Sequence, residues 1–470
     1  MESVTSGISR LLRSASIIFF GIVIGRGLAL LSEVIIIRSL QPSTFGILAL
    51  AYSISLIVGQ ISRAGVPSGL TRFLSEEKSH NQKRGYLQAS YIIVCIISMS
   101  FVLFLLINRY RISSILGDSE LSNTLIFFVP FIIFFPISHV SVSVLRSEGE
   151  NIRTVIARNI LPRFGSLSLF VFLSGIYWSY SAAIIYWVSL PIITTLISLY
   201  YISRDNNLYD LITISVDTKI VRRIWSFSWP LAVSTSLIIF MTYLDIIMIG
   251  YFLDSKKVGL YRSIQPLQQI TVFVLEAIRF LFLPIATQLY NNNKLAELSE
   301  FYTVATKWTV FFSAPIVIIF ILYPKDLVSI FYGNAYLTAA PALSVLVSGL
   351  FYNSFVGPNG SLVKAINSPN IEMYAAGVGV VSNIASNIFL IPDFGIVGAA
   401  MGTAIGFWVY NSIELILVYN EVNIHPFSLD IIKPALPFLL TCYILRYGTS
   451  DIEKSLPTLI LIGVIQVFVL

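Results

Sequence analysis

The sequence predicts an all-α polytopic membrane protein that crosses the bilayer about 14 times, by the length criterion for spanning helices. Hydrophobic residues make up 56 % of the 470 residues and charged residues only 11 %, whereas soluble domains contain about 25 % charged residues. Apolar runs of about 20 residues, enough to cross a bilayer as a helix, recur along the chain. No loop between them is long enough to fold as a catalytic domain, so we expect a helical bundle that is not an enzyme.

The first predicted span, 14–37, carries two charged residues inside its apolar run. Arg26 lies near its middle and Glu33 lies two turns later. A charge at the bilayer centre costs about 2.5–3.5 kcal/mol on insertion scales and normally faces water or a partner rather than lipid. We therefore expect this helix to line a charged cavity around which the other spans assemble. The run is too long for the core of a signal peptide, and no cleavage site follows it, so we expect it to be retained.

The other spans are predicted from apolar runs between polar loops. The second span, 45–74, contains Pro67, where we expect a kink. The small-residue runs at 379–387 and 395–406 favour close packing of two later helices. The last two runs are shorter than a comfortable span. The predicted spans after the second are 86–107, 124–145, 155–175, 181–202, 226–252, 260–290, 303–323, 338–363, 371–391, 396–419, 434–447 and 456–470.

These spans divide the chain into two six-helix lobes. We predict an N-terminal lobe at 1–203, a cytoplasmic linker at 204–224, a C-terminal lobe at 225–420 and two additional spans at 421–470. Loops on one side carry 17 Lys and Arg residues, and loops on the other side carry 9. Because cytoplasmic loops hold the excess of positive charge, we expect a protein of the cell membrane with both termini in the cytoplasm. This bias also explains the net charge of +6, and we expect no nucleic-acid partner.

The two lobes share an internal repeat. Gly46 aligns with Gly259 (259 − 46 = 213) and Pro67 with Pro284 (284 − 67 = 217), and further segments align in the same order. Each repeat holds six spans, which is an even number, so the lobes have the same orientation. We therefore expect them to be pseudo-symmetric about an axis along the membrane normal, with the substrate site between them.

The repeat also aligns charged residues in equivalent spans. Glu33 falls one position from Asp245, and Arg63 falls within one position of Arg279. Glu276 precedes Arg279 by one helical turn and can pair with it on the same helix face. Equivalent helices of the two lobes thus place acids at one depth and arginines at another.

Arginines inside spans suit an anionic substrate, because the guanidinium group presents a fork of donors that fits phosphate oxygens in pairs. We predict a cationic cavity that binds substrate through Arg26, Arg63 and Arg279. The acids could hold a coupling Na⁺ or proton or close a gate; they are Glu33, Asp245 and Glu276. The two cysteines lie in apolar runs, and we expect no catalytic residues, no metal centre and no cofactor beyond this ion.

Several segments carry a family resemblance. They include IRSLQPSTFGILAL at 37–50, YLDIIMIGYFLDSKKVGLYRSI at 243–264 and IPDFGIVGAAMGTAI at 391–405. These segments resemble the polysaccharide flippase family of the multidrug/oligosaccharidyl-lipid/polysaccharide exporter superfamily, over about residues 14–420. The resemblance implies two six-helix lobes in a V shape, alternating access, and an oligosaccharide cargo linked to undecaprenol or dolichol. It also implies cavity arginines in the first, second and eighth helices, as in the related lipid II flippases, at Arg26, Arg63 and Arg279.

We therefore predict a flippase that moves polyprenyl-(pyro)phosphate-linked oligosaccharide across the cytoplasmic membrane for polysaccharide or surface glycan biosynthesis. We expect a monomer whose partners are this cargo and membrane lipids, with a glycan polymerase or glycosyltransferases as further partners. One alternative is a drug or organic-cation antiporter of the same superfamily, whose site should be acidic and aromatic. Another is a membrane glycan polymerase or ligase, which usually needs a larger outer loop than the one predicted at 108–123.

Overall fold

The computed structural model describes residues 2–77, 79–176, 179–205 and 217–428, and in this part of the chain every regular element is a helix. Among these described residues, eleven helical segments are long and apolar enough to cross a membrane. The predicted class, an all-α polytopic membrane protein, is therefore confirmed. The predicted spans at 434–447 and 456–470 lie outside the described residues.

The chain divides into two compact units, Met1–Ile239 and Phe240–Leu470. The division falls inside one long helix, α11 (Thr218–Phe252). The linker predicted at 204–224 lies before this point, and most of it, 206–216, is outside the described residues. The predicted lobe boundaries stay a prediction.

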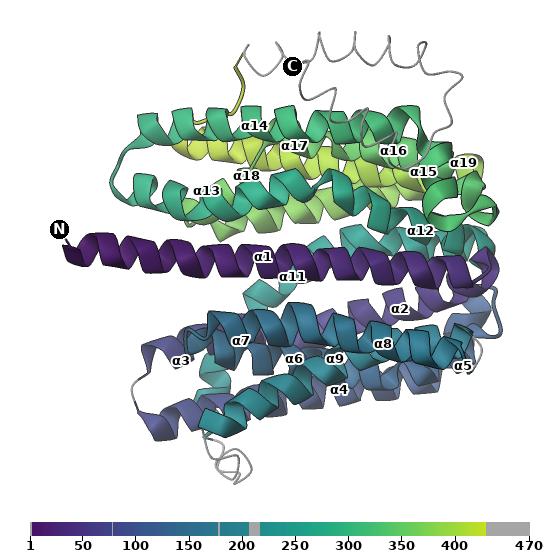
Figure 1. The fold of residues 1–470 in the computed structure, drawn as a ribbon, viewed down its shortest axis with the longest axis horizontal. Helices are drawn as coiled ribbons and strands as arrows, with labels where there is room; N and C mark the ends of the chain where they lie inside the picture. Colours follow the sequence, from purple (N-terminus) through teal and green to yellow (C-terminus); the bar gives the residue numbers. More distant parts are fainter. Residues whose placement is uncertain (1, 78, 177–178, 206–216, 429–470) are drawn as a thin grey trace. The chain divides into compact units, whose positions relative to one another are not determined.

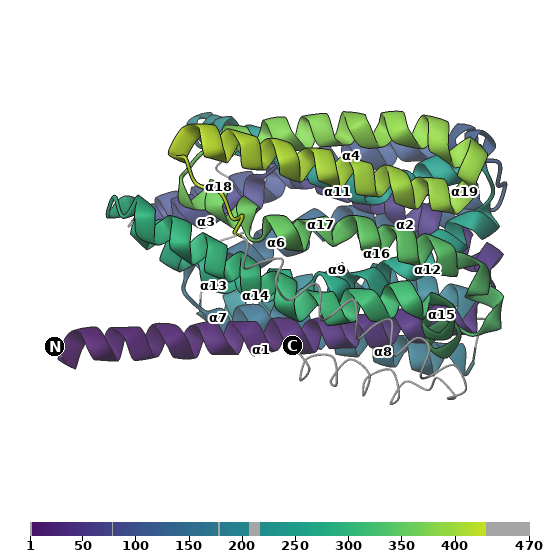
Figure 2. The ribbon, with the colours of Figure 1, turned by 90° about the horizontal axis from the view of Figure 1, so that it is seen from above.

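Unit 1 is a bundle of long helices that run roughly side by side (Figures 1 and 2). It ends with the first part of α11. Its other described elements are α1 (Glu2–Ser39), α2 (Pro42–Arg63), α3 (Val66–Glu76), α4 (His80–Ile115), α5 (Leu121–Phe127), α6 (Val129–Ser147), α7 (Asn151–Val155), the π-helix η1 (Ile156–Ile160), α8 (Leu161–Ser174) and α9 (Ser179–Asp205).

The second predicted span is broken just before the expected kink. α2 ends at Arg63 and α3 begins at Val66, and between them Ala64 and Gly65 adopt φ angles of 50° and 67°. A side chain at Gly65 would overlap a backbone carbonyl of α11, so glycine is required both by its φ and by this close approach. Pro67 lies in the first turn of α3, where its missing N–H costs little. The break therefore occurs at Ala64–Gly65 and not at Pro67, which corrects the prediction.

Unit 2 begins in the second part of α11 and ends in a helical hairpin. Its other described elements are α12 (Ser255–Thr271), α13 (Phe273–Asn291), α14 (Leu295–Leu322), α15 (Pro324–Tyr332), the 3₁₀ helix η2 (Asn334–Ala339), α16 (Ala340–Leu350), α17 (Tyr352–Val356), α18 (Asn359–Ala365) and α19 (Pro369–Val422). A straight helix of 54 residues would be about 80 Å long, far more than the hydrocarbon thickness of about 30 Å. α19 instead turns at Gly395 (φ 59°, ψ −135°) and contains two of the predicted spans.

Small residues bring the two arms of α19 close together. A side chain at Gly402 would overlap the side chain of Asn387, and a Cβ atom at Gly406 would lie 2.7 Å from Cβ of Asn383. Positions later in one arm meet positions earlier in the other, so the arms are antiparallel. The close packing expected from the two small-residue runs is therefore present, and it places the two asparagines between the arms.

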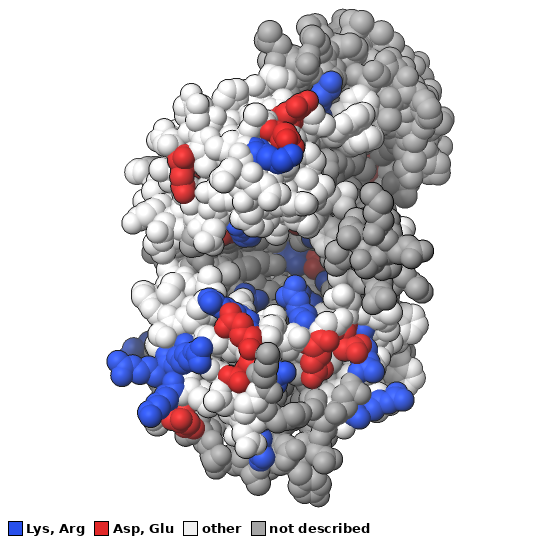
Figure 3. Space-filling view, turned by 90° about the vertical axis from the view of Figure 1, so that its left-hand side faces the viewer, with Lys and Arg blue, Asp and Glu red and all other residues white. Residues whose placement is uncertain are grey.

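Charged side chains gather at the end of unit 1 that Figure 3 faces. In the lower part of this view, several Lys and Arg side chains lie beside Asp and Glu side chains, while most of the remaining surface is uncharged. This distribution is typical of loops that leave a bilayer, because charged groups avoid its hydrocarbon core. The assignment of this end to the cytoplasm stays a prediction.

We predict that Gly402→Val destabilises the hairpin, because the added side chain would overlap Asn387. Overpacking of this kind costs about 1–3 kcal/mol. The measurement is the midpoint temperature of unfolding of the purified protein in detergent. Gly377→Val is the matched control, because a Cβ atom at Gly377 meets nothing within 4 Å and the substitution has the same effect on helix propensity. Equal midpoints for the two variants would contradict the packing described here.

Candidate functional site

The predicted site residues are divided between the two units. In unit 1, Arg26 is exposed on α1, Glu33 is half-buried on the same helix, and Arg63 is half-buried at the last residue of α2. In unit 2, Arg279 is half-buried on α13. Because Arg279 belongs to a different unit from Arg26 and Arg63, their common cavity stays a prediction, as does the role of Glu33 as an ion or gate residue.

Arg63 belongs to a cluster of positive charge in unit 1, in which Arg63 is half-buried and Arg146 and Arg158 are exposed. Arg158 of η1 acts electrostatically on Arg63, and Arg146 and Arg163 act on Arg158. His139 of α6 interacts electrostatically with Arg63, Arg146 and Arg158. Its Nδ1 atom lies 3.0 Å from a backbone carbonyl one turn earlier. The Nε atom of Arg63 is buried and has no hydrogen-bond partner among the described residues. Like charges repel in a medium of low dielectric constant, so this cluster favours the binding of an anion.

Sequence reasoning found only part of this cluster. It identified Arg63 and missed Arg158, which lies in the π-helix and acts electrostatically on Arg63. The signal for the π-helix was Pro162, which follows it closely and has no N–H to continue a regular helix.

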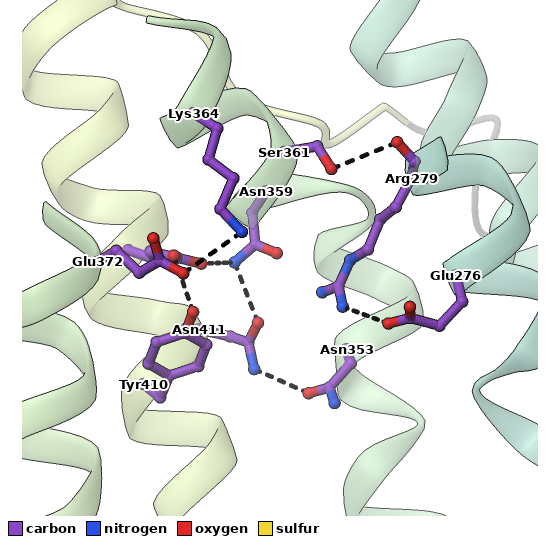
Figure 4. A network of polar contacts seen from close by, with 10 residues as sticks. Glu276, Arg279, Asn353, Asn359, Ser361, Lys364, Glu372, Tyr410 and Asn411 are labelled. Carbon is purple, nitrogen blue, oxygen red and sulfur yellow. Dashed lines mark hydrogen bonds and ion pairs between the residues drawn. The ribbon is translucent and has the colours of Figure 1, made fainter. Parts of the chain in front are cut away.

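Arg279 forms the ion pair that the sequence predicts. Its Nη1 atom lies 3.1 Å from Oε1 of Glu276, one helical turn earlier, and 29 % and 41 % of the two side chains remain exposed (Figure 4). The Nε atom of Arg279 is buried and has no hydrogen-bond partner in the described part of the chain. The pair therefore holds the guanidinium group in place and leaves it donors for a further acceptor.

Asp245 lies at the centre of a polar cluster in unit 2. Asp245 is buried, with 1 % of the residue exposed. The Nδ2 atoms of Asn383 and Asn387 donate to Oδ1 of Asp245 at 3.0 and 2.7 Å. The Tyr261 hydroxyl donates to Oδ2 at 3.1 Å, and the Thr403 hydroxyl also donates to Oδ2. Sequence reasoning found the acid but missed its partners, although the two asparagines at i and i+4 share one helix face.

This Asp245 cluster has the composition of a site for a monovalent cation. It combines one carboxylate with neutral oxygen atoms, so a single positive charge would be balanced. The Oδ1 atoms of Asn383 and Asn387 are buried without a hydrogen-bond partner among the described residues. Rotation of an amide group by 180° exchanges its oxygen and nitrogen, so these two oxygens could face a cation bound by Asp245. Within the described residues, no group of three or more His, Cys, Asp and Glu residues could hold a metal ion.

Comparison with known families identifies the chain. Residues 11–289, more than half of its length, match the family described as polysaccharide biosynthesis protein. The chain belongs to this family. Residues 230–389 also match the MatE family. The two matches place this polysaccharide biosynthesis protein in the multidrug/oligosaccharidyl-lipid/polysaccharide exporter superfamily, as the resemblance predicted.

Curated relatives cover most of the chain. It is 25 % identical over 403 residues to a Haloferax volcanii protein assigned as a low-salt glycan biosynthesis flippase, Agl15, with 85 % of this chain and 81 % of that protein aligned. It is 22 % identical to a Shigella flexneri protein assigned as an O-antigen transporter, with 82 % and 92 % aligned. A membrane protein of Methanocaldococcus jannaschii is 23 % identical, and the chain spans about half of its length, 52 %.

Solved structures share the fold. The lipid II flippase MurJ in an inward closed conformation aligns with a TM-score of 0.79 and 16 % identity, covering 96 % of this chain and 97 % of MurJ. An inward-facing multidrug resistance MATE transporter aligns with a TM-score of 0.74 and 16 % identity, covering 87 % and 98 %. At 16 % identity, this similarity establishes the fold of the chain and does not identify its cargo.

Proposed function

We propose that this protein is a flippase that moves a polyprenyl-(pyro)phosphate-linked oligosaccharide across the cell membrane by alternating access. The observation that carries the proposal is positive charge with spare donors inside membrane helices, at the Arg63 cluster and at Arg279. Membership of a polysaccharide biosynthesis family and the similarity to Agl15 and to the O-antigen transporter support a glycan-bearing cargo.

The proposed mechanism needs binding and movement but no covalent step. The arginines bind the phosphates of the head group, the polar glycan crosses through water, and the polyprenyl chain stays in lipid. Charge-assisted hydrogen bonds from guanidinium to phosphate replace the hydration that the head group loses. Glu276 orients Arg279 through the 3.1 Å ion pair, so the guanidinium group is ready to bind before the cargo arrives.

The same proposal includes the cellular setting. The protein acts as a monomer in the cytoplasmic membrane, with both termini on the cytoplasmic side. It works beside the glycosyltransferases that build the cargo and a polymerase that extends the glycan.

A second candidate function rests on the MatE match at 230–389. An antiporter for organic cations should bind its substrate through acidic and aromatic groups. The arginine cluster of unit 1 disfavours such a substrate, because like charges repel. Efflux of a fluorescent organic cation from cells that express the protein distinguishes the two functions.

For the flippase, we predict that Arg279→Ala slows flipping by about 10–100-fold, because charge-assisted hydrogen bonds contribute about 1.5–3 kcal/mol. The assay uses proteoliposomes that contain polyprenyl-pyrophosphate-linked oligosaccharide with a fluorophore on the glycan, and an impermeant quencher reports transbilayer movement. Arg111→Ala, a substitution of an exposed arginine on α4, is the matched control and should flip normally. Normal flipping by Arg279→Ala would rule out this arginine as a cargo ligand.

We also propose that the Asp245 cluster binds the coupling cation. The support for Na⁺ at this place is that the side-chain oxygens of Asn383 and Asn387, whose amides contact the buried carboxylate, have no hydrogen-bond partner among the described residues. The carboxylate joins α11 to α12 and to both arms of α19, so an ion bound there would act on four helical segments at once.

Sodium should therefore raise the unfolding midpoint of the wild-type protein relative to choline at equal ionic strength. A ligand at about 100 times its Kd stabilises the folded state by about 2.7 kcal/mol. Asp245→Asn should remove the difference between Na⁺ and choline. Asp393→Asn, a change at an exposed position of α19, should preserve it. A sodium effect that persists in Asp245→Asn would place the ion elsewhere.

A further inference from the structure

A second buried polar network in unit 2 surrounds a break in one membrane span. α17 ends at Val356 and α18 begins at Asn359, and Gly357 between them has φ 69° and ψ −149°. Nearby, Asn359 donates through Nδ2 to Oδ1 of Asn411 at 3.0 Å, and Asn411 donates to Oδ1 of Asn353 at 2.8 Å. Breaks of this kind in transporter helices expose polar groups for ion and substrate binding. Neither the Asp245 cluster nor the proposed cargo contacts use these asparagines.

The only carboxylate hydrogen-bonded to this asparagine chain, among the described residues, is Glu414. It is 0 % exposed. Its Oε2 atom accepts from Nδ2 of Asn359 at 2.5 Å, and its Oε1 atom accepts from the Tyr410 hydroxyl at 2.9 Å. Both donors are neutral, and no described residue forms an ion pair with it. A carboxylate withdrawn from water without a paired cation becomes neutral readily by binding a proton, and such residues in membrane spans often carry protons.

The network can serve both protonation states of Glu414. As a carboxylate, Glu414 accepts the N–H of Asn359. As a carboxylic acid, it needs an acceptor, and Oδ1 of Asn359 is buried without a hydrogen-bond partner in the described residues. Asn359 is itself 1 % exposed. Rotation of its amide group would present this oxygen to the new O–H. The amides of Asn411 and Asn353 would rotate with it, so that each donor in the chain again faces an acceptor.

Three charged groups act on Glu414 from the elements around it. They are Arg279 of α13, Lys364 of α18 and Glu372 of α19. Lys364 pairs with Glu372 at 3.5 Å, and Arg279 pairs with Glu276 at 3.1 Å. Arg279 also keeps a buried Nε atom without a hydrogen-bond partner among the described residues, so it is the cation that can still bind an anionic ligand. Tyr410 contacts Glu414 directly, and the charge of Glu414 acts on Tyr302 of α14.

Asn359 and Arg279 lie on neighbouring elements. The Ser361 hydroxyl of α18 donates to the backbone carbonyl of Arg279 at 3.5 Å. Figure 4 shows the amide of Asn359 with its nitrogen toward Asn411 and its oxygen toward the side on which Arg279 lies. The positive charge of Arg279 stabilises a carboxylate at Glu414 by Coulomb attraction. An anion bound to Arg279 cancels this attraction and so favours the carboxylic acid.

We propose that Glu414 is a proton-binding site coupled to Arg279, so that a proton at Glu414 and a pyrophosphate group at Arg279 each strengthen the binding of the other. This inference rests on the proposed binding of cargo by Arg279. Because coupling between sites is reciprocal, the cargo recruits a proton and the proton retains the cargo. The proton gradient would then act on the same unit that holds the head group.

The test measures proton uptake when a pyrophosphate diester binds to the purified full-length protein. The probes are a short-chain polyprenyl-pyrophosphoryl-N-acetylglucosamine in lipid nanodiscs and free UDP-N-acetylglucosamine. Both are diesters that stay ionised near neutral pH, so any proton taken up belongs to the protein. Calorimetric titration in two buffers of different ionisation enthalpy counts the protons, and binding of the soluble probe shows whether the lipid chain is needed.

For the wild-type protein we expect uptake of up to about one proton per diester and an affinity that rises about tenfold between about pH 8 and about pH 6. Glu414→Gln, which mimics the protonated state, should bind without proton uptake and with an affinity independent of pH. Glu297→Gln, a substitution of an exposed glutamate on α14, is the matched control and should keep the uptake. Asn359→Ala, which removes the N–H that the carboxylate accepts, is a second variant and should also lose the uptake.

The outcomes separate the inference from the proposed function. If the wild-type protein binds neither diester, the proposed function fails and the inference fails with it. If the wild-type protein binds a diester and Glu414→Gln takes up as many protons as the wild type, the inference alone is overturned.

Discussion

The constraint on which unit 2 depends is that a polar group in the hydrocarbon core must find its partners inside the protein. Asp245 has four such partners, and they come from α12 and from both arms of α19. The second network joins the α17–α18 break to the last arm of α19 in the same way. Each network fixes helices that are more than 50 residues apart in the sequence. The polar groups therefore specify which helices meet, while apolar packing alone would tolerate several pairings.

Small residues make these contacts geometrically possible. Gly402 and Gly406 lie against Asn387 and Asn383, so a larger residue in either position would push the asparagines away from Asp245. Gly357 similarly lies against Thr306 of α14 and adopts a positive φ. In a bilayer, where lipid tails are as apolar as leucine side chains, close backbone approach and hydrogen bonds replace the hydrophobic effect as the force between helices.

The sequence was sufficient to predict features that depend on a single helix or on the helical period. The helical spans through the described residues and the Glu276–Arg279 pair depend only on apolar length and on i, i+3 spacing, and both are present. The partners of Asp245 lie up to 158 residues away, and the network around Glu414 joins two separate spans. No local pattern encodes such distances. The kink was misplaced for a related reason, because the close approach of α11 to Gly65 is a tertiary contact. The cavity shared by the three arginines stays a prediction, because Arg279 lies in a different unit from Arg26 and Arg63.

The two buried carboxylates of unit 2 are surrounded differently, and the difference matters for what each can bind. Asp245 accepts from four side chains, and hydrogen bonds to a carboxylate favour its charged form. A carboxylate that accepts from four side chains and lies near spare amide oxygens suits a metal cation such as Na⁺. Among the described residues, Glu414 accepts from two side chains, and the amide oxygen of Asn359 has no hydrogen-bond partner. Fewer donors leave the charged form less well held, and the spare acceptor receives the O–H of the neutral form. On these physical grounds the first site is suited to a cation and the second to a proton, so one unit could respond to both gradients.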